Sequence, residues 1–251
     1  RQRVRQRVTE RDIQHKWNES INASFIKVYF FLLSCYYYRD ADAQKEKEKL
    51  GENPCFPGSA LVDVLKKDGK ECRVSMKDLG IGDLVKTIDV STKEVKFTPV
   101  MIFAHHNVES FSTFFKLKLE DGKKIVLSGN HLIFVGPNGK TKMARYVCIN
   151  DLLNLASGGM SKVVNIEEIK EKGFICPITQ EGTVVVNEVL ASCYASCTNF
   201  CGIDAHKIAH AGLFPLRRFK KKIKINNASP IPNQHPYIKM LTQINLPWMA
   251  K

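Results

Sequence analysis

The stretch IVLSGNHLIFV, residues 125–135, decides the fold expected for this chain. It predicts one β-strand over 124–127 and another over 131–135, joined by a tight turn through the polar Ser-Gly-Asn segment. His131 opens the second strand, so a titratable side chain lies at the junction of turn and strand. Such a histidine is either a satisfied core residue or a functional group.

Short β-type runs separated by turn signals continue on both sides of this stretch. Further runs lie at 61–65, 84–90, 114–119 and 163–169. The dipeptides Asp-Gly at 68–69 and 121–122, and Asn-Gly at 138–139, are the strongest short signals of hairpins. The pattern predicts a mainly β fold, a compact all-β domain over 55–190.

The stretch NPCFPGSALV, residues 53–62, marks the start of this domain. Pro54 and Pro57 keep the chain extended, so Cys55 begins or borders a strand. Residues 44–53 are charged and predict a linker or a frayed helix at the end of an N-terminal segment, 1–54.

The chain becomes helix-compatible from about residue 188, and we expect a helical extension and tail over 191–251. Cys193, Cys197 and Cys201 are four residues apart and would share one face of a helix. No Cys-x-x-Cys pair is present, so a metal site is not favoured.

The composition is globular, with 44% hydrophobic and 25% charged residues in 251. The net charge of +13 is concentrated in the basic runs at 1–7 and 217–224. No helix-turn-helix, RNA-binding or zinc-finger signature accompanies them, so a nucleic-acid partner is not expected. The run at 217–224 suits an anionic membrane surface or a solvated tail.

The most apolar stretch, residues 25–38, is too short to span a bilayer comfortably. Ala-Asp-Ala at 41–43 follows it, a pattern of small residues found at signal cleavage sites. The segment predicts a secretory leader or anchor, or else an amphipathic helix.

Several ordered motifs accompany Cys55 and His131, and these are LGIGD at 79–83, GTVVVN at 182–187, ASCYA at 191–195 and HAGLFPLR at 210–217. Together they closely resemble the autoprocessing (Hog, Hint-type) domain of Hedgehog proteins and of the Warthog and Groundhog-like relatives, from Cys55 to about Phe219. The resemblance implies a Hint-type fold, no cofactor, and a role in cell–cell signalling and development. It also implies that the helical extension over 191–251 would meet the sterol or the membrane. It also implies passage through the secretory pathway, with the protein secreted or membrane-associated.

The resemblance implies self-cleavage, with the chain itself as substrate. The Cys55 thiol would attack the carbonyl of Pro54 and convert an amide into a thioester. His131 would protonate the departing amine, a role that suits a group titrating near neutral pH. Ser128 occupies the threonine position of the family's Thr-x-x-His motif and keeps a hydroxyl that can hydrogen-bond the scissile amide.

The second step implied by the resemblance is transfer of the acyl group. In Hedgehog proteins the hydroxyl of cholesterol attacks the thioester, with an aspartate as candidate base, and His105 stands at that position here. Because the unperturbed pKa of His is about 6.5 against about 3.9 for Asp, His105 could be a base for a sterol or for water. The other interpretation places His105 and His106 on a surface strand end.

Cys193 matches a further family cysteine, either structural or disulfide-bonded to Cys55 so that the nucleophile is inactive until reduced. Peptide mass mapping without reductant would exclude the disulfide by finding both thiols free. The rival function is a cleavage-inactive secreted binding or signalling module. Intein-like splicing is disfavoured because no His-Asn pair followed by Cys, Ser or Thr ends the chain.

We expect Pro54→Gly to accelerate thioester formation. The family usually has glycine before the cysteine, whereas a prolyl carbonyl is more hindered and its φ is fixed. The measurement is the rate at which a fragment beginning at Cys55 appears, in the variant and in the natural chain. Equal or slower cleavage in the variant would contradict this expectation.

Overall fold

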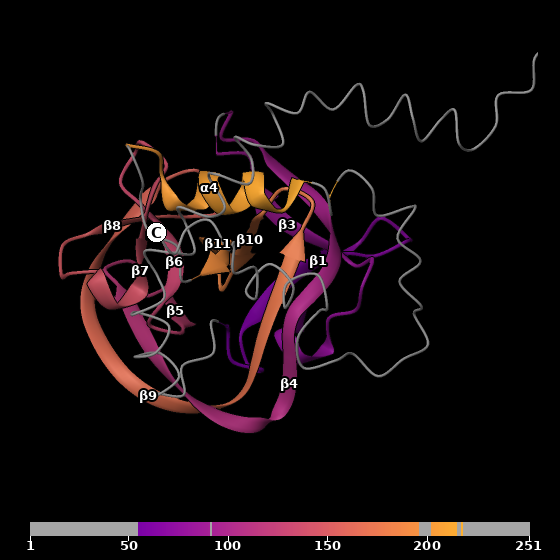
Figure 1. The fold of residues 1–251 in the computed structure, drawn as a ribbon, viewed down its shortest axis with the longest axis horizontal. Coiled ribbons are helices and arrows are strands. Elements are labelled where there is room, and N and C mark those ends of the chain that lie inside the picture. The colour runs from indigo at the N-terminus through magenta and orange to yellow at the C-terminus, as the bar shows by residue number, and fades with distance from the viewer. Residues whose placement is uncertain (1–54, 91, 196–201, 215–216, 218–251) are drawn as a thin grey trace, which may run out of the picture.

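Eleven strands of one connected sheet dominate the computed structural model, which describes residues 55–90, 92–195, 202–214 and 217 (Figure 1). The strands are β1 (Leu61–Leu65), β2 (Glu71–Ser75), β3 (Leu84–Ile88), β4 (Val95–Leu119), β5 (Lys124–Leu127), β6 (His131–Val135), β7 (Lys140–Met143), β8 (Leu152–Asn154), β9 (Met160–Thr179), β10 (Thr183–Val186) and β11 (Val189–Ala195). Two 3-10 turns, η1 (Met76–Asp78) and η2 (Ala144–Tyr146), and one helix, α4 (Ala205–Gly212), complete the described elements. The prediction of a mainly β fold is confirmed.

The two long strands β4 and β9 pair antiparallel and form the arc along the lower edge of Figure 1. Their register shifts in four places, between Val100 and Leu119, and such irregularities bend and twist a strand. The sheet runs in the order β10-β11-β6-β8-β9-β4-β3-β1-β2, with β5 on β4 and β7 on β6. The strand pairs of the described sheet are all antiparallel, as short connections require.

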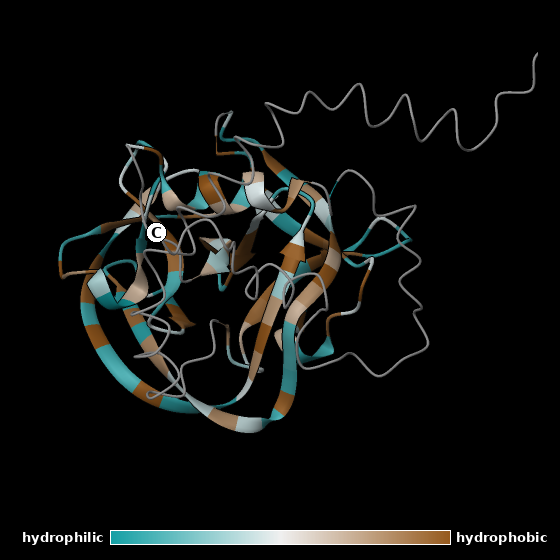
Figure 2. Ribbon diagram, in the orientation of Figure 1, coloured by the Kyte–Doolittle hydropathy of each residue, from teal (hydrophilic) through white to brown (hydrophobic). Residues whose placement is uncertain are grey.

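Apolar side chains from nearly every strand fill the inside of this curved sheet. Figure 2 shows hydrophobic and hydrophilic residues following one another along β4 and β9. Where β4 crosses the interior, however, the five residues 100–104 are all buried and the alternation stops. Sequence runs therefore predicted only the ends of the two long strands, at 114–119 and 163–169, and missed their continuity.

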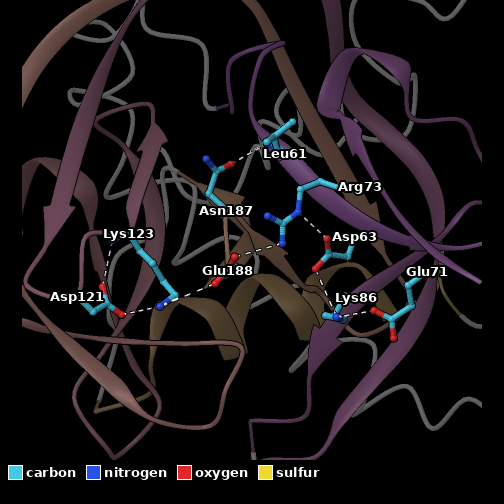
Figure 3. A network of polar contacts seen from close by, with 9 residues as sticks. All are labelled: Leu61, Asp63, Glu71, Arg73, Lys86, Asp121, Lys123, Asn187 and Glu188. Atoms are coloured by element: carbon cyan, nitrogen blue, oxygen red, sulfur yellow. Dashed lines mark hydrogen bonds and ion pairs between the residues drawn. The ribbon is translucent and has the colours of Figure 1, made fainter.

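The turn between β10, at one end of the sheet, and β11 is bonded to β1, the second strand from the other end. Asn187 and Glu188 form this two-residue turn with φ of 50° and 68°, as a type I′ hairpin requires. The Asn187 N–H donates to the Leu61 carbonyl at 2.8 Å, and the Leu61 N–H donates to Asn187 Oδ1 at 2.8 Å. This reciprocal pair attaches β1 to the turn, as Figure 3 shows for the side-chain half.

Ion pairs surround this attachment on the surface (Figure 3). They connect Asp121, Lys123, Glu188, Arg73, Asp63, Lys86 and Glu71 in one chain. The pair of Arg73 with Glu188 is exposed and contributes about 0–1 kcal/mol, whereas the Asp63 and Lys86 side chains are only 15% and 18% exposed.

The expectation that helix-compatible sequence begins near residue 188 is wrong at its start. Residues 189–195 form β11, and the described helix is α4, so the expected domain boundary at 190 falls inside a strand. Six of the seven β11 residues are buried, and a fully buried strand shows no period of two that would separate it from a helix. Cys193 is therefore on a strand, while Cys197 and Cys201 lie outside the described residues.

Within the described ranges, no helix combines the length and apolar character needed to cross a bilayer. The expectations for the segment 1–54, for Pro54 and for the basic run after Arg217 lie outside the described residues.

We expect Asn187→Ala to lower the free energy of unfolding by about 1–3 kcal/mol. The change leaves the Leu61 N–H without its acceptor and puts alanine at a positive φ. Denaturant unfolding at one pH measures the loss. Asn187→Gly is the matched control, because it removes the same acceptor but tolerates this φ. It should be less destabilising than Asn187→Ala, and equal losses would show that φ does not matter here.

Candidate functional site

Cys55 enters the site through main-chain hydrogen bonds on both sides. The next residue, Phe56, exchanges two N–H···O bonds of 2.9 Å with Ile175 of β9. The Cys55 carbonyl accepts from the Ser128 N–H at 2.9 Å, and the Cys55 side chain is fully buried. The start of the domain is thus held between β9 and the turn that precedes β6.

That turn, over residues 128–131, presents its first side chain to the Cys55 amide. The Cys55 N–H donates to Ser128 Oγ at 2.9 Å, and Ser128 Oγ donates to Asn130 Oδ1 at 3.0 Å. The His131 N–H closes the turn on the Ser128 carbonyl at 3.0 Å. The hydrogen bond expected between the Ser128 hydroxyl and the amide before Cys55 is therefore present.

Gly129 is the one residue of this turn that must be small. A Cβ atom there would lie 2.8 Å from the ring of Phe115, and the Gly129 carbonyl accepts from the Arg145 N–H at 2.8 Å. The turn is therefore packed between β4 and η2, which fixes the direction in which Ser128 and His131 project.

His131 is completely buried, with its ring 4.3 Å from the ring of Phe56, centroid to centroid. Its Nε2 lies 2.8 Å from the carbonyl oxygen of Ser192, and because a carbonyl only accepts, Nε2 carries the proton. Nδ1 then holds the lone pair, and it has no hydrogen-bond partner among the described residues. Burial lowers the pKa of His131 to about 4, so the imidazole is neutral at neutral pH. The expectation that His131 titrates near neutral pH is therefore wrong.

Three buried cysteines lie near one another behind the turn, and none is in a disulfide. Burial raises the pKa of the Cys55 thiol, and the neighbouring Cys176 raises it further. Cys176 Sγ lies 3.5 Å from the Cys193 carbonyl, and Cys193 Sγ lies 3.5 Å from Thr179 Oγ1. Burial raises the pKa of Cys193 to about 11, so all three are thiols at neutral pH.

His105 lies in the middle of β4, opposite Cys176 of β9, and is half-buried. The interpretation of a surface strand end is therefore wrong for its position in the strand. Strand β9 carries Ile175, the partner of Phe56, next to Cys176, the partner of His105. One strand thus separates His105 from the segment that begins with Cys55.

His106 faces different surroundings. Burial lowers its pKa, its Nε2 has no partner in the described part of the chain, and its ring packs against Phe103 at 4.7 Å.

The structure brings Cys55, Ser128 and His131 into one cluster. Cys193 lies next to Cys176, and β9 separates His105 from the segment that begins with Cys55. The sequence analysis did not identify Asn130, Cys176 or Ser192 as parts of this site. Cys176 lies in a plain apolar run, and Ser192 contacts His131 through its main-chain carbonyl, so the type of neither residue indicates its place in the site, although Ser192 lies within the motif at 191–195. In the described ranges no group of three or more His, Cys, Asp or Glu side chains is arranged to hold a metal ion.

We expect the stability of the fold to decrease as the pH falls from 6.5 to 4. In this window the unfolded chain protonates His131, whereas the folded chain, with a pKa of about 4, does not. Protonation of His131 therefore stabilises the unfolded state as the pH falls, and the free energy of unfolding decreases. His131→Gln removes this titration, so urea unfolding at pH 7 and pH 4.5 should show a smaller loss in the variant, by about 2 kcal/mol. The other buried histidines are common to both chains, and equal losses would contradict the assignment.

A family model and several curated proteins match this chain. The family model described as the Hint module matches residues 43–249. Indian hedgehog B protein of Danio rerio is 31% identical over 179 residues, which cover 65% of this chain and 41% of that protein. Warthog protein 4 of Caenorhabditis elegans is 28% identical over 163 residues, 58% of this chain and 28% of that protein.

Protein hedgehog of Drosophila hydei is 32% identical over 155 residues, covering 57% of this chain and 30% of the relative. The gp41-1 intein, known from a crystal structure, is 20% identical, with a TM-score of 0.45 over 56% of this chain and 98% of the intein. The chain spans about two fifths or less of the length of these curated relatives. With a matching family model over most of its length, the chain belongs to the Hint module family and is related to Hedgehog and Warthog proteins.

Proposed function

We propose that the chain cleaves itself before Cys55 by an N-to-S acyl shift. The single observation that supports this most directly is the hydrogen bond from the Cys55 N–H to Ser128 Oγ at 2.9 Å. That N–H belongs to the peptide bond between Pro54 and Cys55, the bond to be broken. The bond fixes the plane of this amide against a rigid turn, and such orientation lowers the barrier to attack by a neighbouring group.

The reaction needs no outside reagent. Cys55 Sγ attacks the carbonyl carbon of Pro54, a C–S bond forms, and the C–N bond to Cys55 breaks. The proton of the thiol ends on the departing nitrogen, which becomes an amine. The products are isomers of the starting chain, so atoms, protons and electrons balance within the protein.

His131 is the proton carrier in this proposal. Both partners begin neutral, because burial raises the pKa of the Cys55 thiol and lowers that of His131 to about 4. The free lone pair on Nδ1 can accept the thiol proton and return it to the departing nitrogen. A low pKa makes the imidazolium a strong acid, which suits the protonation of a poor leaving group.

Release of the N-terminal piece requires a second acyl transfer. A hydroxyl attacks the thioester carbon, the C–S bond breaks, and the Cys55 thiolate takes up a proton. We propose His105 as the base that accepts the hydroxyl proton, since it lies half-buried across one strand from the start of the site. The acceptor is a sterol such as cholesterol or, because His105 replaces the family's aspartate, water.

The setting proposed for this reaction is the secretory pathway, with the protein secreted or membrane-associated and active in Hedgehog-like cell–cell signalling. Its relatives include hedgehog proteins, which supports this proposal. A cleavage-inactive secreted binding or signalling module is the second candidate. Pro54 favours it, because its carbonyl is more hindered than that of glycine.

The test is intact mass against time for residues 1–251 under reducing conditions, with and without cholesterol, beside Cys55→Ala. We expect a break before Cys55 that the Cys55→Ala variant does not make. An N-terminal fragment heavier by one sterol identifies transfer, and a free acid identifies hydrolysis. A chain that stays intact under all conditions would exclude self-cleavage and favour the binding module.

Ser128 supplies a matched pair of variants for the same assay. Ser128→Ala removes the acceptor of the Cys55 N–H and should slow the break by about tenfold, which is about 1.4 kcal/mol of barrier. Ser128→Thr keeps the hydroxyl and should remain close to the natural rate. If both variants cleave equally fast, the hydroxyl has no part in the reaction.

A further inference from the structure

Ser192 of β11 connects His131 to the helix α4. Its carbonyl accepts from His131 Nε2–H at 2.8 Å, and its Oγ lies 2.9 Å from Nδ1 of His206 on α4. Ser192 is completely buried and His206 nearly so. One residue therefore contacts the proposed proton carrier with its main chain and the C-terminal helix with its side chain.

The Ser192 carbonyl is available because β11 is irregular at this point. The pairing of β11 with β6 shifts register between Ala191 and Ala195, so the intervening residues leave the regular ladder. The Tyr194 N–H donates to Ser192 Oγ at 3.0 Å. The shape of the bulge, and with it the direction of the Ser192 carbonyl, thus depends on bonds made by the Ser192 side chain.

His206 is held rigidly where it meets that side chain. Asp204, the N-cap of α4, accepts the His206 N–H at 2.9 Å and the N–H of Thr141 on β7 at 2.7 Å. The His206 ring packs against Phe134 of β6 at 5.0 Å and Tyr194 at 5.2 Å. The helix is therefore attached to β7 and β6, the hairpin that also carries His131.

The charges around His206 keep this link neutral. Burial lowers the pKa of His206 to about 3, and His210, Arg217 and Lys207 oppose its protonation further. A neutral ring can exchange a hydrogen bond with the Ser192 hydroxyl without placing a charge beside the site.

We propose that His206 is a positioning residue for the cleavage step, acting through Ser192 to aim the carbonyl that orients His131. This inference rests on the self-cleavage proposed above. The His131 ring has one hydrogen bond among the described residues, the one to Ser192, because Nδ1 has no partner. If that carbonyl turns, the ring loses the contact that fixes both its tautomer and its angle. The helical extension is then part of the cleavage machinery and not only a region that would meet the sterol or membrane.

The experiment compares single-turnover cleavage rates of the full chain and its variants. His206→Leu removes the hydrogen bond but keeps bulk, and we expect it to slow cleavage by about tenfold, or about 1.4 kcal/mol of barrier. His206→Asn presents an amide where Nδ1 was, and should restore much of the rate. His210→Leu makes the same change one turn later on α4. It removes the stacking of His210 on the His206 ring and the bond to the Tyr194 hydroxyl but leaves the bond between His206 and Ser192, so it should slow cleavage less than His206→Leu.

Ser192→Ala gives a second, smaller perturbation that keeps the carbonyl and removes Oγ, in case His206→Leu fails to fold. It too should slow cleavage by about tenfold. A folded Ser192→Ala chain, or a folded His206→Leu chain, that cleaves at the natural rate would overturn the proposal. Slowing by His210→Leu equal to that by His206→Leu would also overturn it, since helix packing alone would then be the cause.

Imidazole ¹⁵N and Nε2–H spectra separate this inference from the proposed function. They are recorded in Cys55→Ala, which remains uncleaved whatever the natural chain does. We expect His131 to be protonated at Nε2, and this proton to shift and exchange faster with water when His206→Leu is added. An unchanged His131 signal would show that the link is wrong even if the natural chain cleaves. If the His131 signal changes but the natural chain never cleaves, the link is supported and the proposed function is excluded.

Discussion

The antiparallel pairing of β4 with β9 is the constraint on which the rest of the molecule depends. Strand β9 contacts Phe56 through Ile175 on one edge and His105 through Cys176 on the other. The same strand continues into Thr179, which contacts the Cys193 sulfur. Residues more than a hundred positions apart in sequence thus meet because one long, repeatedly kinked strand passes between them.

A buried, uncharged interior is the second consequence of this arrangement. The three thiols and His131 are all buried, and burial disfavours the charged form of each. A charged nucleophile waiting beside a peptide bond would be costly to bury. The site instead holds neutral partners, and charge separation is deferred to the reaction, where fixed dipoles such as the Ser192 carbonyl are already oriented.

The sequence predicted short, locally coded features well and extended ones poorly. The strands β1, β5 and β6 match the predicted runs because each is bounded by a turn with its own chemical signal. The centre of β4 lacks such a signal, and β11 is too uniformly buried to reveal its period. Cys55, Ser128 and His131 could be found through motif resemblance. Ser192 and Cys176 could not, because their contributions arise from a bulge and a ladder register that only the folded chain defines.

The buried hydrogen bond of the Cys55 nitrogen also bears on the fate of the chain after a cut. Once the peptide bond is broken, this nitrogen becomes an α-amine, whose ordinary pKa of about 8 makes it a cation at neutral pH. Its surroundings are a hydroxyl, thiols and a neutral imidazole, which offer poor solvation for an ammonium. The new chain end would therefore be driven out towards water, and a protonated amine cannot attack the thioester it has just left. Burial of the peptide bond before Cys55 would then oppose the re-formation of this bond once it is cleaved.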